Sequence, residues 1–207
     1  GAGLGAESRI GRKTNRMNDV IDTLVGIAPG SKLDAIRANR SEARKHAQAS
    51  YASLFEPRDL AGVTTDERHA IAAFVAGLHG EARTDAFYAA KLPAGLRATV
   101  VAEVASARSK GPYGRFPKGP LSVEDAPGPT WKVSDAGAKA LGTRLSAAFE
   151  HTHMLVFHPR DAAAPALQAL LDAGWSTTDI VTISQLVAFL SYQIRVVAGL
   201  TTLASSL

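Results

Sequence analysis

Apolar side chains recur three and four positions apart through most of the chain, which is the period of α-helices that bury one face. The clearest case lies within residues 62–92. Thr64 and Glu67 have the spacing of a capping box, so a helix is predicted to begin there. Its apolar stripe consists of Ile71, Phe74, Val75 and Leu78.

This helix is predicted to end at a glycine, with a second helix directly after it. His79 and Gly80 close the first helix, Glu81 opens the second, and Pro93 interrupts the second. We take this helix break as the candidate functional centre.

The same periodicity predicts helices along the rest of the chain, at 18–27, 31–54, 95–107, 134–158, 161–173 and from 176 onward. No stretch has the alternation of a β-strand, so the predicted fold is all-α, with seven or eight helices. A single domain is expected over residues 17–207. Residues 1–16 are Gly-rich and basic and precede the first Met, and we expect them to be a disordered extension or an expression remnant.

The stretch 108–130 interrupts the helical pattern. It contains nine Gly and Pro residues, so no regular element of normal length fits there. A long insertion of this kind is typical of a lid, a binding loop or an intersubunit arm, although its basic residues also fit plain solvated charge. Tyr113 and Phe116 give it aromatic surface, and we expect it to pack over the candidate centre or onto a neighbouring subunit.

Composition excludes several classes of function. The chain has 46% hydrophobic and 20% charged residues, which is ordinary for a soluble globular protein. Its net charge of +4 comes mainly from residues 1–16, so nucleic acid is not an expected partner. No apolar run of membrane-spanning length is free of polar breaks, so no membrane span is predicted. A cytoplasmic location is the default expectation.

The absence of cysteine removes disulfides, thiolate metal sites and every thiol mechanism. Three histidines lie close in sequence, at 151, 153 and 158. On a continuous helix, His151 and His153 point about 200° apart and cannot both face one ion. No metal and no cofactor are therefore expected.

The helix-break-helix layout of residues 62–92 resembles the alkylhydroperoxidase D-like and carboxymuconolactone decarboxylase superfamily, whose members are all-helical oligomers. The stretch 167–200 also resembles the closing helix pair of the peroxidase-related members, in which Ala-Gly and a Ser cap lead into a long apolar helix with an Arg near its end, here Arg195. The resemblance implies an alkylhydroperoxidase D-like helical bundle over most of residues 18–205. Homo-oligomers, dimers or larger, are expected, and the apolar last helix favours the same state.

In the peroxidase branch, this layout carries Cys-x-x-Cys-x-x-x-His, with a Glu twelve residues before the first Cys. Glu81 and Thr84 occupy the two Cys positions of that pattern, Tyr88 the His position and His69 the Glu position. Because all four functional residue types differ, the resemblance does not imply thiol peroxidase activity.

Two functions of different class remain open. In the first, the protein binds a small molecule, or is a non-thiol acid/base enzyme, in the family pocket, as in the decarboxylase branch. Candidate catalytic residues are then His69, Glu81 and Tyr88, and candidate ligand contacts are Thr84, Tyr113 and Phe116. In the second, it is a non-catalytic oligomeric partner of an active antioxidant homologue. Glu81 also fits a favourable first-turn acid, and His69 a solvent-facing helix residue.

Overall fold

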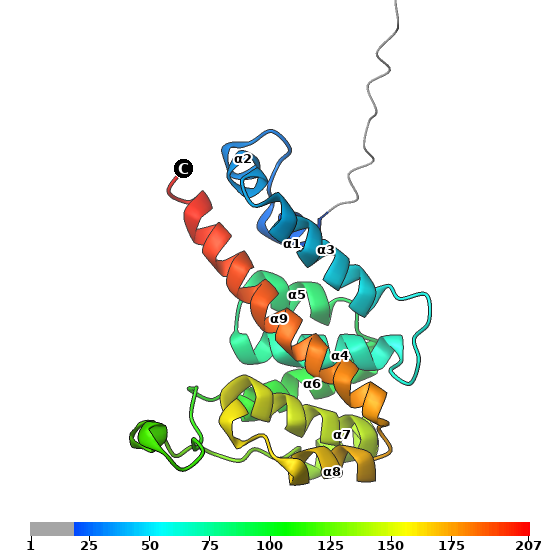
Figure 1. Ribbon diagram of the computed structural model, residues 1–207. Coiled ribbons are helices and arrows are strands. Elements are labelled where there is room, and N and C mark those ends of the chain that lie inside the picture. Colours follow the sequence, from blue (N-terminus) through cyan, green and yellow to red (C-terminus); the bar gives the residue numbers. More distant parts are fainter. Residues whose placement is uncertain (1–18) are drawn as a thin grey trace, which may run out of the picture.

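The computed structural model describes residues 19–207, and within this range the chain is all-helical, as predicted (Figure 1). Gly114 and Ala126 form an isolated β-bridge, and residues 19–207 contain no β-strand. The α-helices of this range are α1 (Val20–Val25), α2 (Lys32–Ala38), α3 (Ser41–Phe55), α4 (Thr65–His79), α5 (Ala82–Ala89), α6 (Ala94–Ala107), α7 (Asp135–Phe157), α8 (Ala164–Asp172) and α9 (Thr177–Ala204). Two short 3₁₀ helices, η1 (Pro120–Glu124) and η2 (Pro159–Asp161), flank α7 in sequence.

Helix α4 lies at the centre of the domain. It packs against α5, α6, α7 and α9, and α9 crosses it in Figure 1. Every residue from Ala70 to Leu78 is buried, which is the property of a helix that is apolar on all sides. Phe74 stacks on Phe149 of α7, with 4.3 Å between the ring centroids. The predicted capping box is present, because the Thr64 hydroxyl accepts from the Glu67 amide and Glu67 accepts from the Thr64 amide.

The connection between α3 and α4 is held by a buried guanidinium group. Arg68 projects from the first turns of α4 and is almost fully buried. Its nitrogen atoms donate to three backbone carbonyls, those of Leu54 at 2.7 Å, Val63 at 2.9 Å and Leu60 at 3.0 Å. The side chain thus satisfies carbonyl groups that a loop buried beside a helix would otherwise leave unpaired.

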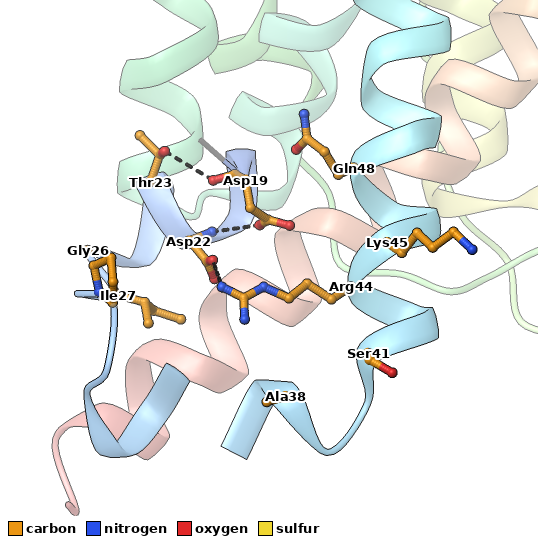
Figure 2. Close-up of a pocket in the computed structure, with 11 residues that line it drawn as sticks. Asp19, Asp22, Thr23, Gly26, Ile27, Ala38, Ser41, Arg44, Lys45 and Gln48 are labelled. Atoms are coloured by element: carbon orange, nitrogen blue, oxygen red, sulfur yellow. Dashed lines mark hydrogen bonds and ion pairs between the residues drawn. The ribbon is translucent and has the colours of Figure 1, made fainter. Parts of the chain in front are cut away.

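The stretch 31–54, predicted as one helix, forms two helices instead, with a turn at Asn39 and Arg40. The turn allows two arginines, one from each helix, to reach carboxylates of α1 and α2. Arg37 pairs with Asp19 and Asp22, and Arg44 pairs with Asp22 and Asp34. Figure 2 shows Arg44 extending from α3 toward Asp22 on α1. On one straight helix, residues 37 and 44 would lie about 10 Å apart along the axis, too far to share a carboxylate easily.

The loop after α6 is anchored at both ends on α6 and α7. Tyr113 is buried, its amide donates to the Phe157 carbonyl at 2.9 Å, and its hydroxyl donates to the Pro129 carbonyl at 2.7 Å. Trp131 donates to the Ser106 hydroxyl at 3.1 Å. Between these anchors the segment 116–125, which includes η1, projects away from the helices in Figure 1, and we call it the arm.

Helix α9 is the longest helix of the described range, and its apolar composition fits either a buried core helix or a membrane span. By length and composition it is the one helix among residues 19–207 that could cross a membrane. Half of its most apolar window is buried inside the domain, against α1, α3, α4, α7 and α8. A core helix of a soluble protein gives the same signal, so the signal alone is weak.

Close packing of α4 on α6 depends on a glycine. A Cβ atom added to Gly77 would lie 2.7 and 2.8 Å from the two γ-methyl groups of Val104. Real Cβ atoms do not approach this closely, and the stiff β-branched Val104 side chain has little freedom to move aside. Gly77 therefore sets the distance between the two helices.

We expect Gly77→Ala to destabilise the domain by about 1–3 kcal/mol, because the added methyl group forces α4 and α6 apart. Urea unfolding followed by circular dichroism measures the change. Gly95→Ala is the matched control, since a Cβ there meets nothing within 4 Å and alanine is the better helix former, so its effect should be neutral or slightly stabilising. Equal effects of the two substitutions would contradict this account of the α4–α6 contact.

Candidate functional site

The predicted helix break forms at Gly80. This residue has a left-handed backbone (φ 70°), and its amide donates to the Ala76 carbonyl at 2.9 Å, which ends α4. Glu81 then caps α5, because its carboxylate accepts from the Arg83 amide at 3.3 Å and from the Thr84 amide at 2.8 Å. The buried Thr84 hydroxyl also donates to Glu81. Both residues of this pair thus stabilise the N-terminus of α5.

His69 lies on α4, one turn beyond the N-terminus, and is half-buried. Its ring stacks on Phe55 at 5.6 Å between centroids. Burial lowers the pKa of His69, and the positive charge of Lys91 lowers it further. The imidazole is therefore held toward its neutral form at neutral pH.

Tyr88 is fully buried on α5. Its hydroxyl donates to Oε1 of Gln193 on α9 at 2.7 Å, and its ring lies 5.3 Å from that of Phe55. His69 and Tyr88 therefore both contact the Phe55 ring. Among residues 19–207, no hydrogen bond or ion pair joins Glu81 to His69 or Tyr88. A catalytic role for these three residues stays a prediction.

We expect Tyr88→Phe to destabilise the domain by about 1–2 kcal/mol, because it leaves the buried Gln193 carbonyl oxygen without a donor. Tyr51→Phe is the matched control. Tyr51 is also buried in the same aromatic cluster, but its hydroxyl has no hydrogen-bond partner among the described residues. Removal of the Tyr51 hydroxyl should therefore change the free energy of unfolding only slightly. Urea titration of the two variants distinguishes them, and equal destabilisation would show that the Tyr88–Gln193 bond contributes nothing.

A pocket of about 650 Å³ opens beside the helix break, between the end of α4, the middle of α9, the end of α7 and the start of the loop. We call it the break pocket. Its size lies in the range of small-molecule sites. Apolar walls come from residues that include Leu78, Leu155, Phe157 and Val187, and the polar lining consists of His79, Ser109, Lys110, Ser184, Ser191 and Arg195.

The polar groups of the break pocket are all cationic or neutral, and none of its lining residues is acidic. His79 Nε2 lies 3.2 Å from the Ser191 hydroxyl oxygen. Arg195, one turn further along α9, donates to the Ser191 carbonyl at 2.8 Å. Burial lowers the pKa of His79, and the charge of Arg195 adds to this. The pocket thus offers fixed positive charge beside a histidine that is held toward its neutral form.

Sequence reasoning found the break but did not single out the side chains that line this pocket. One signal was available. Ser184, Ser191 and Arg195 are spaced by seven and by four, so they share one face of an otherwise apolar helix. A polar stripe on an apolar helix indicates that this face of α9 lies against polar groups or solvent. The partner residue His79 lies 112 positions earlier, and no local pattern connects the two.

A second concave region, between α1 and α3, has about 560 Å³ but a different electrostatic character (Figure 2). Its lining includes Asp19, Asp22, Arg44 and Lys45. The aspartates are paired with Arg37 and Arg44, as described above. Because opposite charges neutralise one another there, this region has less to attract a charged ligand than the break pocket.

The two loop residues predicted as ligand contacts lie outside the break pocket. Tyr113 stacks on His158, with 5.0 Å between the ring centroids, and Phe116 lies beneath the Arg160 guanidinium at 4.0 Å. The preceding segment 109–112 does line the pocket. The loop therefore forms one wall of the break pocket, and its contacts are with α7 and η2 instead of with His69 or Tyr88.

Within residues 19–207, no group of three or more His, Asp or Glu side chains is placed to hold a metal ion. His153 contacts Trp131 and Phe157, and its Nε2 donates to the Ala107 carbonyl at 3.1 Å, whereas neither ring nitrogen of His151 has a hydrogen-bond partner among the described residues. Comparison of the chain with protein-family models, curated proteins and solved structures gave no match. The fold and site thus define an all-helical domain with a cationic pocket.

Proposed function

We propose that this protein binds a small organic anion, with at least one carboxylate, in the break pocket. Arg195 and Lys110 supply the attraction, Ser191 supplies a hydroxyl group, and the apolar walls contact the body of the ligand. The observation that carries the proposal is a pocket of ligand size whose lining contains two fixed cations and a histidine but no acid.

His79 is the group suited to acid/base chemistry in such a site. A bound carboxylate raises its pKa, so the imidazole takes up a proton when the ligand binds. The Ser191 hydroxyl, 3.2 Å away, fixes the orientation of the ring. If the protein is an enzyme, we propose that proton transfer passes through His79.

The proposed family is the alkylhydroperoxidase D-like and carboxymuconolactone decarboxylase superfamily, of which this chain would be a divergent, cysteine-free member. The helical layout and the pocket beside the α4–α5 break support this proposal. A decarboxylase-like member acts without thiols and would need a site for carboxylates. That requirement agrees with the charge of the break pocket.

The alternative is a non-catalytic oligomeric partner of an active antioxidant homologue. The arm favours it, because Leu121 and Val123 at its tip are 53% and 89% exposed. Apolar side chains on a projecting segment are typical of a surface that another subunit covers. Light scattering that gives only the monomer mass, 21.7 kDa, over a wide concentration range would count against any oligomer.

Benzoate is a suitable first probe of the anion proposal, and benzamide is its neutral counterpart of the same shape. We expect calorimetry to detect benzoate but not benzamide, and Arg195→Gln to weaken benzoate binding by at least about tenfold. Lys139→Gln is the control, because this exposed lysine of α7 lies outside the pocket and carries the same charge. An equal loss of benzoate affinity in the two variants would show that only the net charge of the protein matters, and it would overturn the proposed site.

The affinity for benzoate should depend on pH through His79. The pKa of this residue is lowered in the free protein and raised by a bound anion, so binding takes up a proton. Affinity is therefore expected to rise as the pH falls from about 8 to about 5, in which range benzoate stays largely ionised. His79→Gln should remove this dependence while Arg195 still attracts the ligand. A pH profile that is the same in the variant would exclude His79 from the site.

A further inference from the structure

We propose that another, smaller cavity, between α7, α8 and the segment 130–132, binds a small neutral aromatic molecule through a hydroxyl group. The cavity has about 140 Å³ and shares no lining residue with the break pocket. His151 and His158 both line it. The inference is independent of the anion proposal.

His151 is the observation that requires explanation. Its side chain is only 6% exposed, and neither ring nitrogen has a hydrogen-bond partner among the described residues. Buried polar atoms are rarely left unpaired, because their desolvation is not recovered. Burial lowers the pKa of His151, which keeps the ring neutral with one donor and one acceptor nitrogen. A group in the cavity that can both donate and accept, such as a hydroxyl, matches this ring.

His158 is a second histidine that lines the same cavity. Its Nδ1 lies 3.1 Å from the Asp161 carboxylate, and its ring is stacked on Tyr113. A carboxylate only accepts, so the proton resides on Nδ1 and Nε2 is an acceptor in the neutral ring. No residue of the described range bonds to that Nε2. Asp161 and Tyr113 thus hold His158 in one orientation.

The remaining walls select against a charged ligand and in favour of an aromatic ring. Lys132 Nζ is paired with Glu150 at 2.6 Å, and the Glu150 carboxylate also accepts from the Val133 amide at 3.2 Å. The two opposite charges therefore offset each other. Trp131 and Met154 give a flat, polarisable contact surface. An apolar cavity of about 150 Å³ in another protein takes up benzene, so a single ring fits this volume.

Phenol and toluene are the probes, because they have the same shape and differ in the hydroxyl group. We expect ligand-observed NMR titration to show phenol binding at least about tenfold more tightly than toluene, the effect of pairing buried polar atoms. His151→Phe keeps a planar ring of similar size and should bring phenol down to the affinity of toluene. Arg195→Gln, in the break pocket, should leave phenol binding unchanged.

A second variant tests the proposal independently if His151→Phe folds poorly. Ala166→Leu fills the cavity from α8 without changing either histidine, and we expect it to abolish phenol binding while circular dichroism stays that of the parent protein. Equal affinities of phenol and toluene for the parent protein, or phenol binding that survives Ala166→Leu, would overturn the proposal. Absence of any phenol binding would also overturn it and would assign the cavity to water alone.

Discussion

The burial of α4 on every side is the constraint on which the rest of the structure depends. A helix can be surrounded in this way only if its neighbours approach closely, and its small residues, among them Ala72, Ala76 and Gly77, permit that approach. The surrounding helices α5, α6, α7 and α9 then have little choice of distance. Gly80, which ends α4, turns the chain into α5 close to the end of α7, the middle of α9 and the start of the loop after α6.

That convergence explains why the break pocket lies where it does. A helix that ends in the middle of a bundle leaves its last turn facing the middle of a longer helix, here α9. Polar side chains on both helices can then face each other at a partly buried position. His79 and Ser191 meet under this condition, and Arg195 sits at the edge, where its charge remains hydrated.

Local sequence patterns predicted the helices well because helix caps and apolar stripes are determined by residues that lie close together in sequence. The Thr64 capping box, the Gly80 terminus and the Ser176 cap of the last helix all depend on neighbours in sequence, and each is present. The turn at residue 39 was missed because the ion pairs on its two sides join Arg37 and Arg44 to Asp19 and Asp22, more than ten residues away in sequence. The kink at Gly142, with φ 73° inside α7, was missed as well.

The candidate site was harder to predict than the fold for the same reason. The sequence located the break, but the side chains that line the pocket there come from α7, α9 and the loop, all distant along the chain. Buried titratable groups add a further difficulty. His69, His79, His151 and His153 look alike in sequence, whereas in the fold one stacks on Phe55, one meets a serine, one has no partner and one donates to a carbonyl.

The three carbonyl groups that Arg68 holds have a consequence for how this protein can change during evolution. All its partners are backbone atoms, so none of them disappears when a side chain between residues 56 and 63 is replaced. Arg68 holds the path of that connection through backbone atoms alone, which leaves the side chains along it free to vary. Gly62 is an exception, because a Cβ atom there would lie 2.2 Å from the Asp179 carboxylate. A single inherited arginine can therefore preserve the geometry of a segment whose own sequence diverges beyond alignment.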